Sequence, residues 1–378
     1  MGKIFLAALG LVLVACQAAW AFDTAARSAI VMDHRTEEVL FAKNADESIP
    51  PASMSKLMTA FIVFEELQAG RLKLDDTLLV SEKAWRTGGS KMFVHVGDRV
   101  SVEDLLRGMI IQSGNDACVV LAEALEGSEA GMAQRMTRRA AEIGLTASRF
   151  KNVTGLDDPD HKMSVRDLAM LASRIIRDFP EYYKYYSEKE FEYGSPKKIK
   201  QYNRNPLLQA GVPGVDGVKT GFTDDAGYGL VVSAERDGRR VISVLAGLDN
   251  VRLRKSESEQ LLEYGFREFQ EYRLFAKGET VAEAPVWLGA TATVPLVPAE
   301  TIGVTMRREL RKDLTVKLRY DAPVPAPIKA GDPIATLVVT QPGKPPREVP
   351  LVAGAAVPRA GIVGRLTSAF GYLVFGGG

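Results

Sequence analysis

Hydrophobic and polar positions follow one period near the start of the chain and another through its middle. Residues 29–31 and 39–42 are short apolar runs separated by a polar turn, which predicts a pair of strands. Residues 56–67 then place apolar side chains on one face of a helix. The further stretches with helical spacing are 101–111, where Ser101 and Asp104 form a capping box, 116–125, 128–143 and 165–178.

The period changes again after about residue 213. The strand-like runs in this region are 215–220, 229–234 and 241–246, and they are followed by a helical pattern at 256–272. Strands on both sides of a helical section predict one antiparallel sheet covered by a helical insertion, which is an α+β fold.

Beyond about residue 275 the pattern changes once more, to short β-rich stretches that alternate with proline-rich turns. The expected strands are 287–294, 302–306, 314–320 and 335–340. We therefore expect a large domain at 22–274, which would carry any catalytic site, and a small all-β domain at 275–358. Residues 360–375 place four apolar side chains on one helical face, with Arg365 as the only cation in that range, which predicts a weakly membrane-associating amphipathic tail at 359–378.

Residues 1–21 have the features of a signal peptide. Lys3 is followed by an apolar stretch at 4–15 that is too short to span a bilayer, and Ala19 and Ala21 are small residues suited to cleavage. We expect cleavage after Ala21. The alternative is a lipoprotein box ending at Cys16, which would then be lipidated. Both interpretations predict an exported protein that acts in the periplasm, at the outer face of the cytoplasmic membrane.

Charge and cysteine content narrow the possible functions. A formal net charge of +1 over 378 residues argues against nucleic acid as a partner. With Cys16 removed, Cys118 is the only cysteine, so no intrachain disulfide is expected and Cys118 is predicted to be a small core residue.

The strongest candidate for chemistry is Ser53, which is followed by Lys56. Three residues apart at the start of a helix, the two side chains share a face, so a deprotonated lysine could take the serine proton. Ser148 and Ser195 also precede a lysine by three residues, but neither opens an apolar helix, and both are expected in surface loops.

Two further short motifs stand in order after Ser53. Ser113-Gly114-Asn115 falls in the turn between two predicted helices, and Lys219-Thr220-Gly221 falls in a predicted strand. Alone, a helix cap would explain the first motif, and an edge-strand lysine with a bulge glycine would explain the second.

Histidine and metal chemistry are not predicted. The three histidines are His34 in a turn, His95 in an expected strand and His161 after an acidic loop, and none has a metal-ligand partner at helical spacing. We therefore expect no cofactor and no metal.

Ser-x-x-Lys, Ser-x-Asn and Lys-Thr-Gly in this order resemble the signature of penicillin-binding proteins and serine β-lactamases. The longer matches around Ser53, Asn115 and Lys219 resemble the low-molecular-mass D-alanyl-D-alanine carboxypeptidases over nearly the whole mature chain. The resemblance implies the penicillin-binding fold and a serine-type carboxypeptidase that acts on peptidoglycan peptides ending in D-Ala-D-Ala, with β-lactam antibiotics as covalent inhibitors.

The resemblance also implies residue roles. Ser53 would be the nucleophile and Lys56 its base, with Ser113 and Asn115 on the opposite wall of the cleft, and Lys219 would depress the pKa of Lys56.

On the substrate-binding side, the resemblance places Thr220 and Gly221 beside the substrate. The backbone N–H groups of Ser53 and Phe222 would form the oxyanion hole. Arg254, beside Thr220, would hold the substrate carboxylate.

The sequence leaves alternatives at some positions. Arg252 and Lys255 compete with Arg254, and Asp167 is explained equally well as a helix-capping residue.

Other functions remain open as well. An endopeptidase that cuts peptide cross-links would use the same residues. A serine β-lactamase is less favoured because residues 155–167 hold no glutamate, and an inactive wall-binding homologue would be expected to lack a motif residue.

Overall fold

Five antiparallel strands form the sheet on which the larger part of the molecule is built. The computed structural model describes residues 22–194 and 197–361. The sheet order is β2–β1–β9–β8–β7. The strands are β1 (Ser28–Asp33), β2 (Val39–Lys43), β7 (Val215–Thr223), β8 (Gly227–Arg236) and β9 (Arg239–Leu248).

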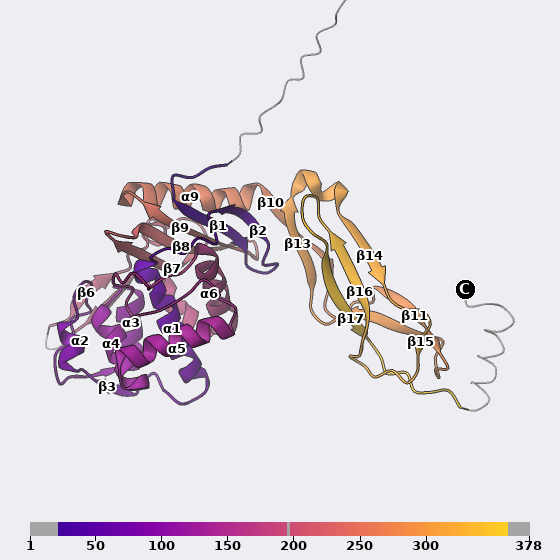
Figure 1. The fold of residues 1–378 in the computed structure, drawn as a ribbon, viewed down its shortest axis with the longest axis horizontal. Helices are drawn as coiled ribbons and strands as arrows, with labels where there is room; N and C mark the ends of the chain where they lie inside the picture. The colour runs from indigo at the N-terminus through magenta and orange to yellow at the C-terminus, as the bar shows by residue number, and fades with distance from the viewer. Residues whose placement is uncertain (1–21, 195–196, 362–378) are drawn as a thin grey trace, which may run out of the picture.

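Helices cover both faces of this sheet, as Figure 1 shows. One face carries the long insertion between β2 and β7, and the other carries α9 (Val251–Arg267). The main helices of the insertion are α1 (Lys56–Gln68), α3 (Val102–Ile110), α4 (Asn115–Glu126), α5 (Glu129–Glu142) and α6 (Val165–Asp178). Its smaller elements are η1 (Ala52–Ser55), β3 (Thr77–Leu79), α2 (Glu82–Arg86), β4 (Arg99–Ser101), α7 (Pro180–Tyr183), η2 (Lys184–Ser187), β5 (Glu190–Tyr193), β6 (Ile199–Tyr202) and α8 (Pro206–Gln209).

Strand β1 lies between two hydrophobic cores. Ile30 and Met32 pack with the helical insertion, whereas Ala29 and Val31 pack with the core beneath α9. Alternate side chains of a strand point to opposite faces, so a strand covered on both faces is apolar throughout. This explains why the run at 29–31 is continuous rather than alternating.

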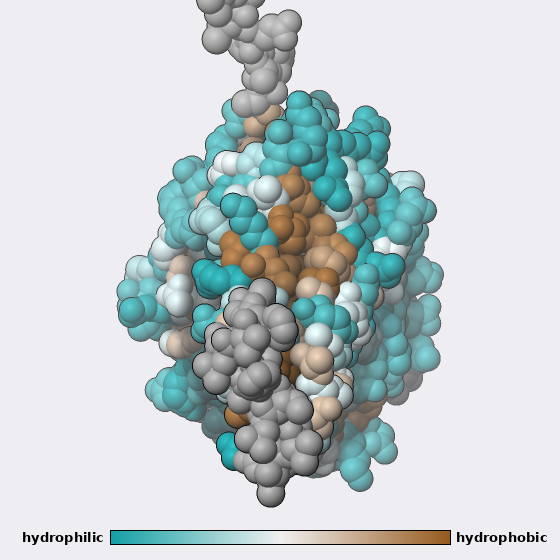
Figure 2. Space-filling view, turned by 90° about the vertical axis from the view of Figure 1, so that its right-hand side faces the viewer, coloured by the Kyte–Doolittle hydropathy of each residue, from teal (hydrophilic) through white to brown (hydrophobic). Residues whose placement is uncertain are grey.

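The rest of the described chain forms a β-rich domain beside the domain that contains the five-stranded sheet (Figure 1). Its six-stranded sheet has the order β14–β16–β17–β12–β11–β15, and β10 pairs with β13. The elements are β10 (Phe269–Phe275), β11 (Ala282–Trp287), β12 (Thr293–Pro298), β13 (Ile302–Arg307), η3 (Arg308–Asp313), β14 (Thr315–Arg319), β15 (Val324–Pro325), β16 (Pro333–Thr340) and β17 (Arg347–Ala353). Figure 2, which views this end of the molecule, shows an apolar patch bordered by hydrophilic residues.

The predicted antiparallel sheet, helical insertion and β-rich C-terminal part are confirmed, but two elements were predicted wrongly. The helix expected at 256–272 ends at Arg267, because Phe269 is buried and residues 269–275 pair with β13. The strand expected at 287–294 falls on the turn between β11 and β12, which pair with each other. In the first case pairing with distant residues overrides the local pattern, and in the second a hairpin turn falls within the apolar run that was taken for one strand.

Three sequence-based expectations concern residues that the structure does not describe. These are the signal peptide with Cys16, the loop at Ser195 and the amphipathic tail beyond residue 361. Within residues 22–194 and 197–361, no helix is long and apolar enough to cross a membrane.

Candidate active site

Ser53 lies in a single 3₁₀ turn that leads directly into helix α1. Lys56, the first residue of α1, places its Nζ 2.8 Å from the Ser53 Oγ. The same Nζ donates a second hydrogen bond to the backbone carbonyl of Thr154, on the loop that follows α5. The Lys56 residue is 2% exposed. The predicted serine–lysine pair therefore forms a direct contact, with the lysine amine held from two sides.

Burial sets the proton affinity of this amine. Removal from water, which disfavours the charged form, together with the nearby charge of Arg204 lowers the pKa of Lys56 from its ordinary value to about 8. About a tenth of the amine is therefore free base at pH 7. The resemblance implied that Lys219 would depress the pKa of Lys56; burial is the largest cause, and the like charges of Lys56 and Lys219 also disfavour protonation of both amines.

The opposite wall of the cleft carries Ser113 and Lys219. The Lys219 Nζ donates to the Ser113 Oγ over 3.0 Å, and both residues are buried. Burial and the charge of Lys56 lower the pKa of Lys219 well below its usual value. Ser113 has φ 66°, a left-handed conformation that costs about 1–3 kcal/mol for a residue with a side chain and is concentrated at functional sites.

Asn115 is held in the cleft by contacts with the neighbouring loop. Its Nδ2 donates to the Gly88 carbonyl at 2.8 Å and its backbone N–H donates to the Ser90 carbonyl at 2.7 Å. Asp116 anchors the continuation of this loop, because its buried carboxylate accepts backbone N–H groups of residues 92–94. The Asn115 side chain is thereby fixed facing Ser53 across the cleft.

Two glycines allow backbone to approach the Ser53 turn closely. A Cβ on Gly221 would lie 2.9 Å from the Pro51 carbonyl oxygen, so glycine lets β7 run directly beside the turn. A Cβ on Gly155 would lie 1.9 Å from the Ala52 carbonyl oxygen, and Gly155 also has φ +80°. These glycines therefore determine how close β7 and the Thr154 loop come to the nucleophile.

The cleft has a volume of about 540 Å³, and its lining includes cationic and aromatic side chains. Arg254 and Arg204 line it, and none of the lining residues in the described chain is Asp or Glu. The exposed ring of Phe222 stacks on the ring of Tyr228, with the two centroids 4.2 Å apart. The Arg254 guanidinium lies over the same Tyr228 ring, 5.4 Å from its centroid. An anionic substrate is favoured by this arrangement.

The structure brings the sequence-predicted residues together in this one cleft. The lining includes Ser53, Ser113, Asn115, Thr220, Gly221, Phe222 and Arg254, with the Lys56 and Lys219 amines bonded to its serines. Arg252 and Lys255, the competitors of Arg254, are exposed on α9 and do not line the cleft.

Sequence reasoning missed several residues of the cleft. Arg204, Tyr228 and Leu156 line it but belong to no motif, so the sequence contained no signal for them. A signal did exist for Gly155, because it is the first residue of the segment 155–167, in which the sequence analysis considered only the absence of a glutamate.

Other predictions need correction. Ser148 is buried and donates to the Asp167 carboxylate at 2.7 Å, so it is not a surface-loop residue. Asp167 donates its backbone N–H to the Ser164 Oγ, so Ser164 caps α6, and the Asp167 carboxylate instead accepts from the Ala147 N–H and the Ser148 hydroxyl. His95 lies in an exposed loop rather than a strand, and His34 and His161 do not line the cleft.

Cys118 is buried in α4, as predicted, and burial raises its pKa to about 12. Among residues 22–194 and 197–361, no group of three or more His, Cys, Asp or Glu side chains could hold a metal ion.

A serine bonded to a buried lysine amine, facing Ser-x-Asn and Lys-Thr-Gly across one cleft, defines the serine–lysine class of acyl-transfer enzymes. Residues 15–250 match the D-alanyl-D-alanine carboxypeptidase family, and residues 269–359 match the C-terminal domain of penicillin-binding protein 5. The chain belongs to the D-alanyl-D-alanine carboxypeptidase family.

Individual relatives agree with this assignment. The chain is 40% identical to D-alanyl-D-alanine carboxypeptidase DacC of Escherichia coli over 90% of its length and 86% of that protein. Penicillin-binding protein 5 of Haemophilus influenzae superposes with a TM-score of 0.83 at 35% identity, covering 89% of this chain and 98% of that one. An ampicillin-bound penicillin-binding protein of Listeria monocytogenes gives a TM-score of 0.59 at 33% identity, covering 65% and 99% of the two chains.

Replacing Gly155 with alanine tests whether the close approach of the Thr154 loop to the Ser53 turn matters for acylation. The new Cβ would collide with the Ala52 carbonyl and displace the turn that holds Ser53. Since a shift of about 1 Å in a reacting group can lower a rate ~10²-fold, we expect acylation of Ser53 by an activated acyl donor to slow ~10–100-fold. Mass spectrometry of the acylated protein measures this rate.

Gly144→Ala is the matched control. Gly144 has φ +84°, so both variants carry the same left-handed strain, but no atom lies within 4 Å of its added Cβ. Equal acylation rates in the two variants would show that the contact with Ala52 is unimportant.

Proposed function

We propose that the chain is a serine-type carboxypeptidase that removes the terminal D-alanine from peptidoglycan peptides ending in D-Ala-D-Ala. The observation that carries the proposal is the 2.8 Å contact between the Lys56 amine and the Ser53 hydroxyl, within a cleft that contains two arginines and no carboxylate. Membership of the carboxypeptidase family supports the same substrate.

The first half-reaction forms an ester on Ser53. The Ser53 Oγ attacks the carbonyl carbon of the penultimate D-alanine while neutral Lys56 accepts the hydroxyl proton. The backbone N–H groups of Ser53 and Phe222 donate to the developing oxyanion, and one such donor typically contributes a factor of ~10²–10³ in rate. The C–N bond then breaks, and the leaving amine receives a proton through Ser113, which Lys219 contacts.

Arg254 is the residue we assign to the terminal carboxylate of the substrate. Its guanidinium lines the cleft near Thr220, and its Nε is buried without an acceptor among the described residues. The neighbouring ring of Tyr228, itself stacked on Phe222, holds the guanidinium in place through a cation–π contact. Tyr228 is therefore a positioning residue for Arg254.

Hydrolysis of the ester by water completes the cycle, and here the missing carboxylate matters. Class A β-lactamases use a glutamate to activate water against the penicillin ester. With no Asp or Glu among the residues lining this cleft, a β-lactam should form a stable adduct rather than a turnover product. An endopeptidase would form the same ester on Ser53, but the peptide it cuts would offer Arg254 no chain-terminal carboxylate next to the scissile bond. The arginine therefore favours the trimming of chain ends.

Penicillin provides the most direct test of the nucleophile. Incubation with penicillin should give a covalent adduct on Ser53 that persists for minutes or longer, because no carboxylate activates water in the cleft. Peptide mapping by mass spectrometry identifies the labelled residue and its lifetime. Ser53→Ala should lose the adduct while unfolding at a similar temperature, whereas labelling of another serine or release within seconds would contradict the proposal.

Substitution of Arg254 tests carboxylate recognition. A hydrogen bond to a charged group contributes ~1.5–3 kcal/mol, so Arg254→Ala should lower kcat/KM on a D-Ala-D-Ala peptide ~10–100-fold. The same peptide with a C-terminal amide should be affected little. Tyr228→Leu should show the same selectivity with a smaller loss, since it leaves the guanidinium present but less firmly positioned.

Arg252→Ala is the matched control, because Arg252 is an exposed arginine on α9 outside the cleft. It should leave both substrates unchanged. Equal losses on the acid and the amide in Arg254→Ala would assign that residue to the fold or the nucleophile instead.

We further propose that the enzyme is exported and acts on the outer face of the cytoplasmic membrane, held there by residues 359–378. The described chain ends at the far end of the β-rich domain from the catalytic domain (Figure 1), so a tail anchor would leave the cleft clear of the membrane. Deleting 359–378 should move the protein to the soluble fraction without changing kcat/KM on small peptides. Retention of the truncated protein on membranes would assign the anchor to the N-terminal segment or to Cys16.

A further inference from the structure

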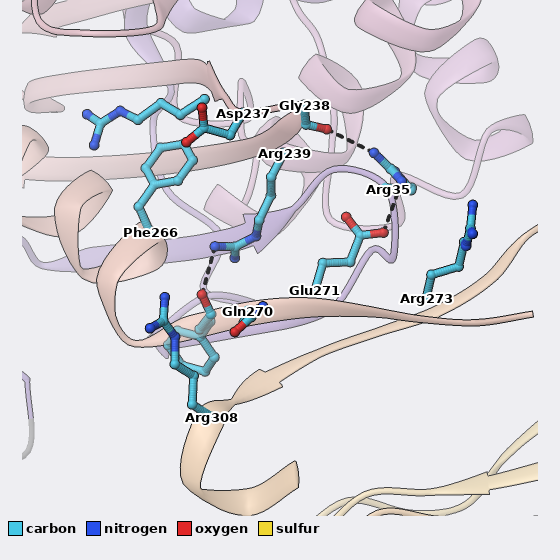
Figure 3. A pocket seen from close by; sticks show the side chains of 11 residues that line it. Arg35, Asp237, Gly238, Arg239, Phe266, Gln270, Glu271, Arg273 and Arg308 are labelled. Carbon is cyan, nitrogen blue, oxygen red and sulfur yellow. Dashed lines mark hydrogen bonds and ion pairs between the residues drawn. The ribbon is translucent and has the colours of Figure 1, made fainter.

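A second hollow, with a volume of about 600 Å³, lies where the two domains meet (Figure 3). On the catalytic side it is formed by the turn between β8 and β9 and by the end of α9. On the other side it is formed by β10 and the start of η3. Five arginines line it, with only two acidic residues, Asp237 and Glu271. The arginines are Arg35, Arg236, Arg239, Arg273 and Arg308.

Three of these arginines have carboxylate partners. Arg35 pairs with Glu271 at 3.2 Å, across the junction between the domains. Arg236 pairs with Glu263 at 2.6 Å, and Arg239 pairs with the fully buried Asp33 at 2.9 Å. These pairs fix part of the wall of the hollow but leave the remaining arginines uncompensated.

Arg273 and Arg308, both from the β-rich domain, are the uncompensated arginines. Both side chains are exposed, and within the described ranges neither has an ion pair or a hydrogen bond. Figure 3 shows both of them extending from the β-rich side toward the catalytic domain. They therefore present unpaired positive charge at a concave surface.

Arg239 has unused donor capacity at the same place. Its Nη1 donates to the Phe269 carbonyl at 3.0 Å, but its Nη2 is buried and finds no acceptor among the described residues. Its guanidinium and that of Arg236 both lie over the Phe266 ring, at 5.7 and 4.4 Å from the centroid. A buried donor without a partner costs about 1–3 kcal/mol.

We propose that this hollow is a binding site for a small phosphate-bearing anion that clasps the two domains. Guanidinium forks match the paired oxygens of a phosphate group. Five arginines face four carboxylates here, those of the lining Asp237 and Glu271 and of the partners Asp33 and Glu263, so one positive charge is left over, which the negative charge of a phosphate group would match. Because the arginines come from both domains, the anion would bind only when the domains hold this arrangement.

The end of α9 and strand β10, which line the hollow, lie at the opposite end of the β-rich domain from the end of the described chain (Figure 1). A soluble or wall-linked phosphate is therefore favoured over a lipid headgroup. The proposal does not depend on the carboxypeptidase chemistry, since none of the five arginines lines the Ser53 cleft.

Titration of the full-length protein with inorganic pyrophosphate at low ionic strength tests the proposal. Isothermal titration calorimetry should give saturable binding, and the anion should raise the melting temperature as expected for a ligand that binds only the folded state. Arg273→Gln/Arg308→Gln should weaken binding at least tenfold and abolish the thermal shift, while leaving acylation of Ser53 unchanged.

Lys317→Gln/Lys329→Gln removes the same charge from exposed positions of the β-rich domain that do not line the hollow. This control should bind pyrophosphate as the wild type does. An absence of saturable binding, or equal weakening in the two double variants, would overturn the site. Binding of citrate as tight as that of pyrophosphate would overturn its assignment to phosphate.

Discussion

The burial of the Lys56 amine beside the Ser53 hydroxyl is the constraint on which the active site depends. A buried ammonium normally requires a carboxylate partner, and here the two hydrogen-bond acceptors of the amine are a hydroxyl and a backbone carbonyl. Neither acceptor carries a charge that would stabilise the protonated form. The lysine therefore lowers its pKa instead, to about 8, and becomes a base suited to a serine nucleophile.

Much of the surrounding structure holds this unfavourable arrangement in place. The Ser53 turn is packed between β7, at Gly221, and the loop that carries Thr154 and Gly155. Across the cleft, Ser113 is kept in a left-handed conformation at the entry to α4. Strained and uncompensated groups persist only where the fold around them is rigid, and this cleft lies against the main hydrophobic core.

The motif residues could be predicted from the sequence because they occur in three short motifs that follow one another in a fixed order. Ser53 with Lys56, and the predicted strand around Lys219, needed only local spacing to be located. Arg204 and Tyr228 could not be found in this way, since each reaches the cleft only through tertiary packing and belongs to no pattern. Residues 269–272 were assigned to a helix for the same reason: their strand conformation comes from pairing with β13.

Titration of Lys56 itself tests the central claim most directly. Protein labelled with ¹³C at the lysine Cε can be followed by NMR across a pH series, and the resonance absent from Lys56→Arg identifies the residue. The account predicts a titration midpoint near the value of about 8 that burial imposes. A midpoint at the ordinary lysine value of about 10.4 would contradict it, because the amine would then remain protonated at neutral pH and could not accept the serine proton.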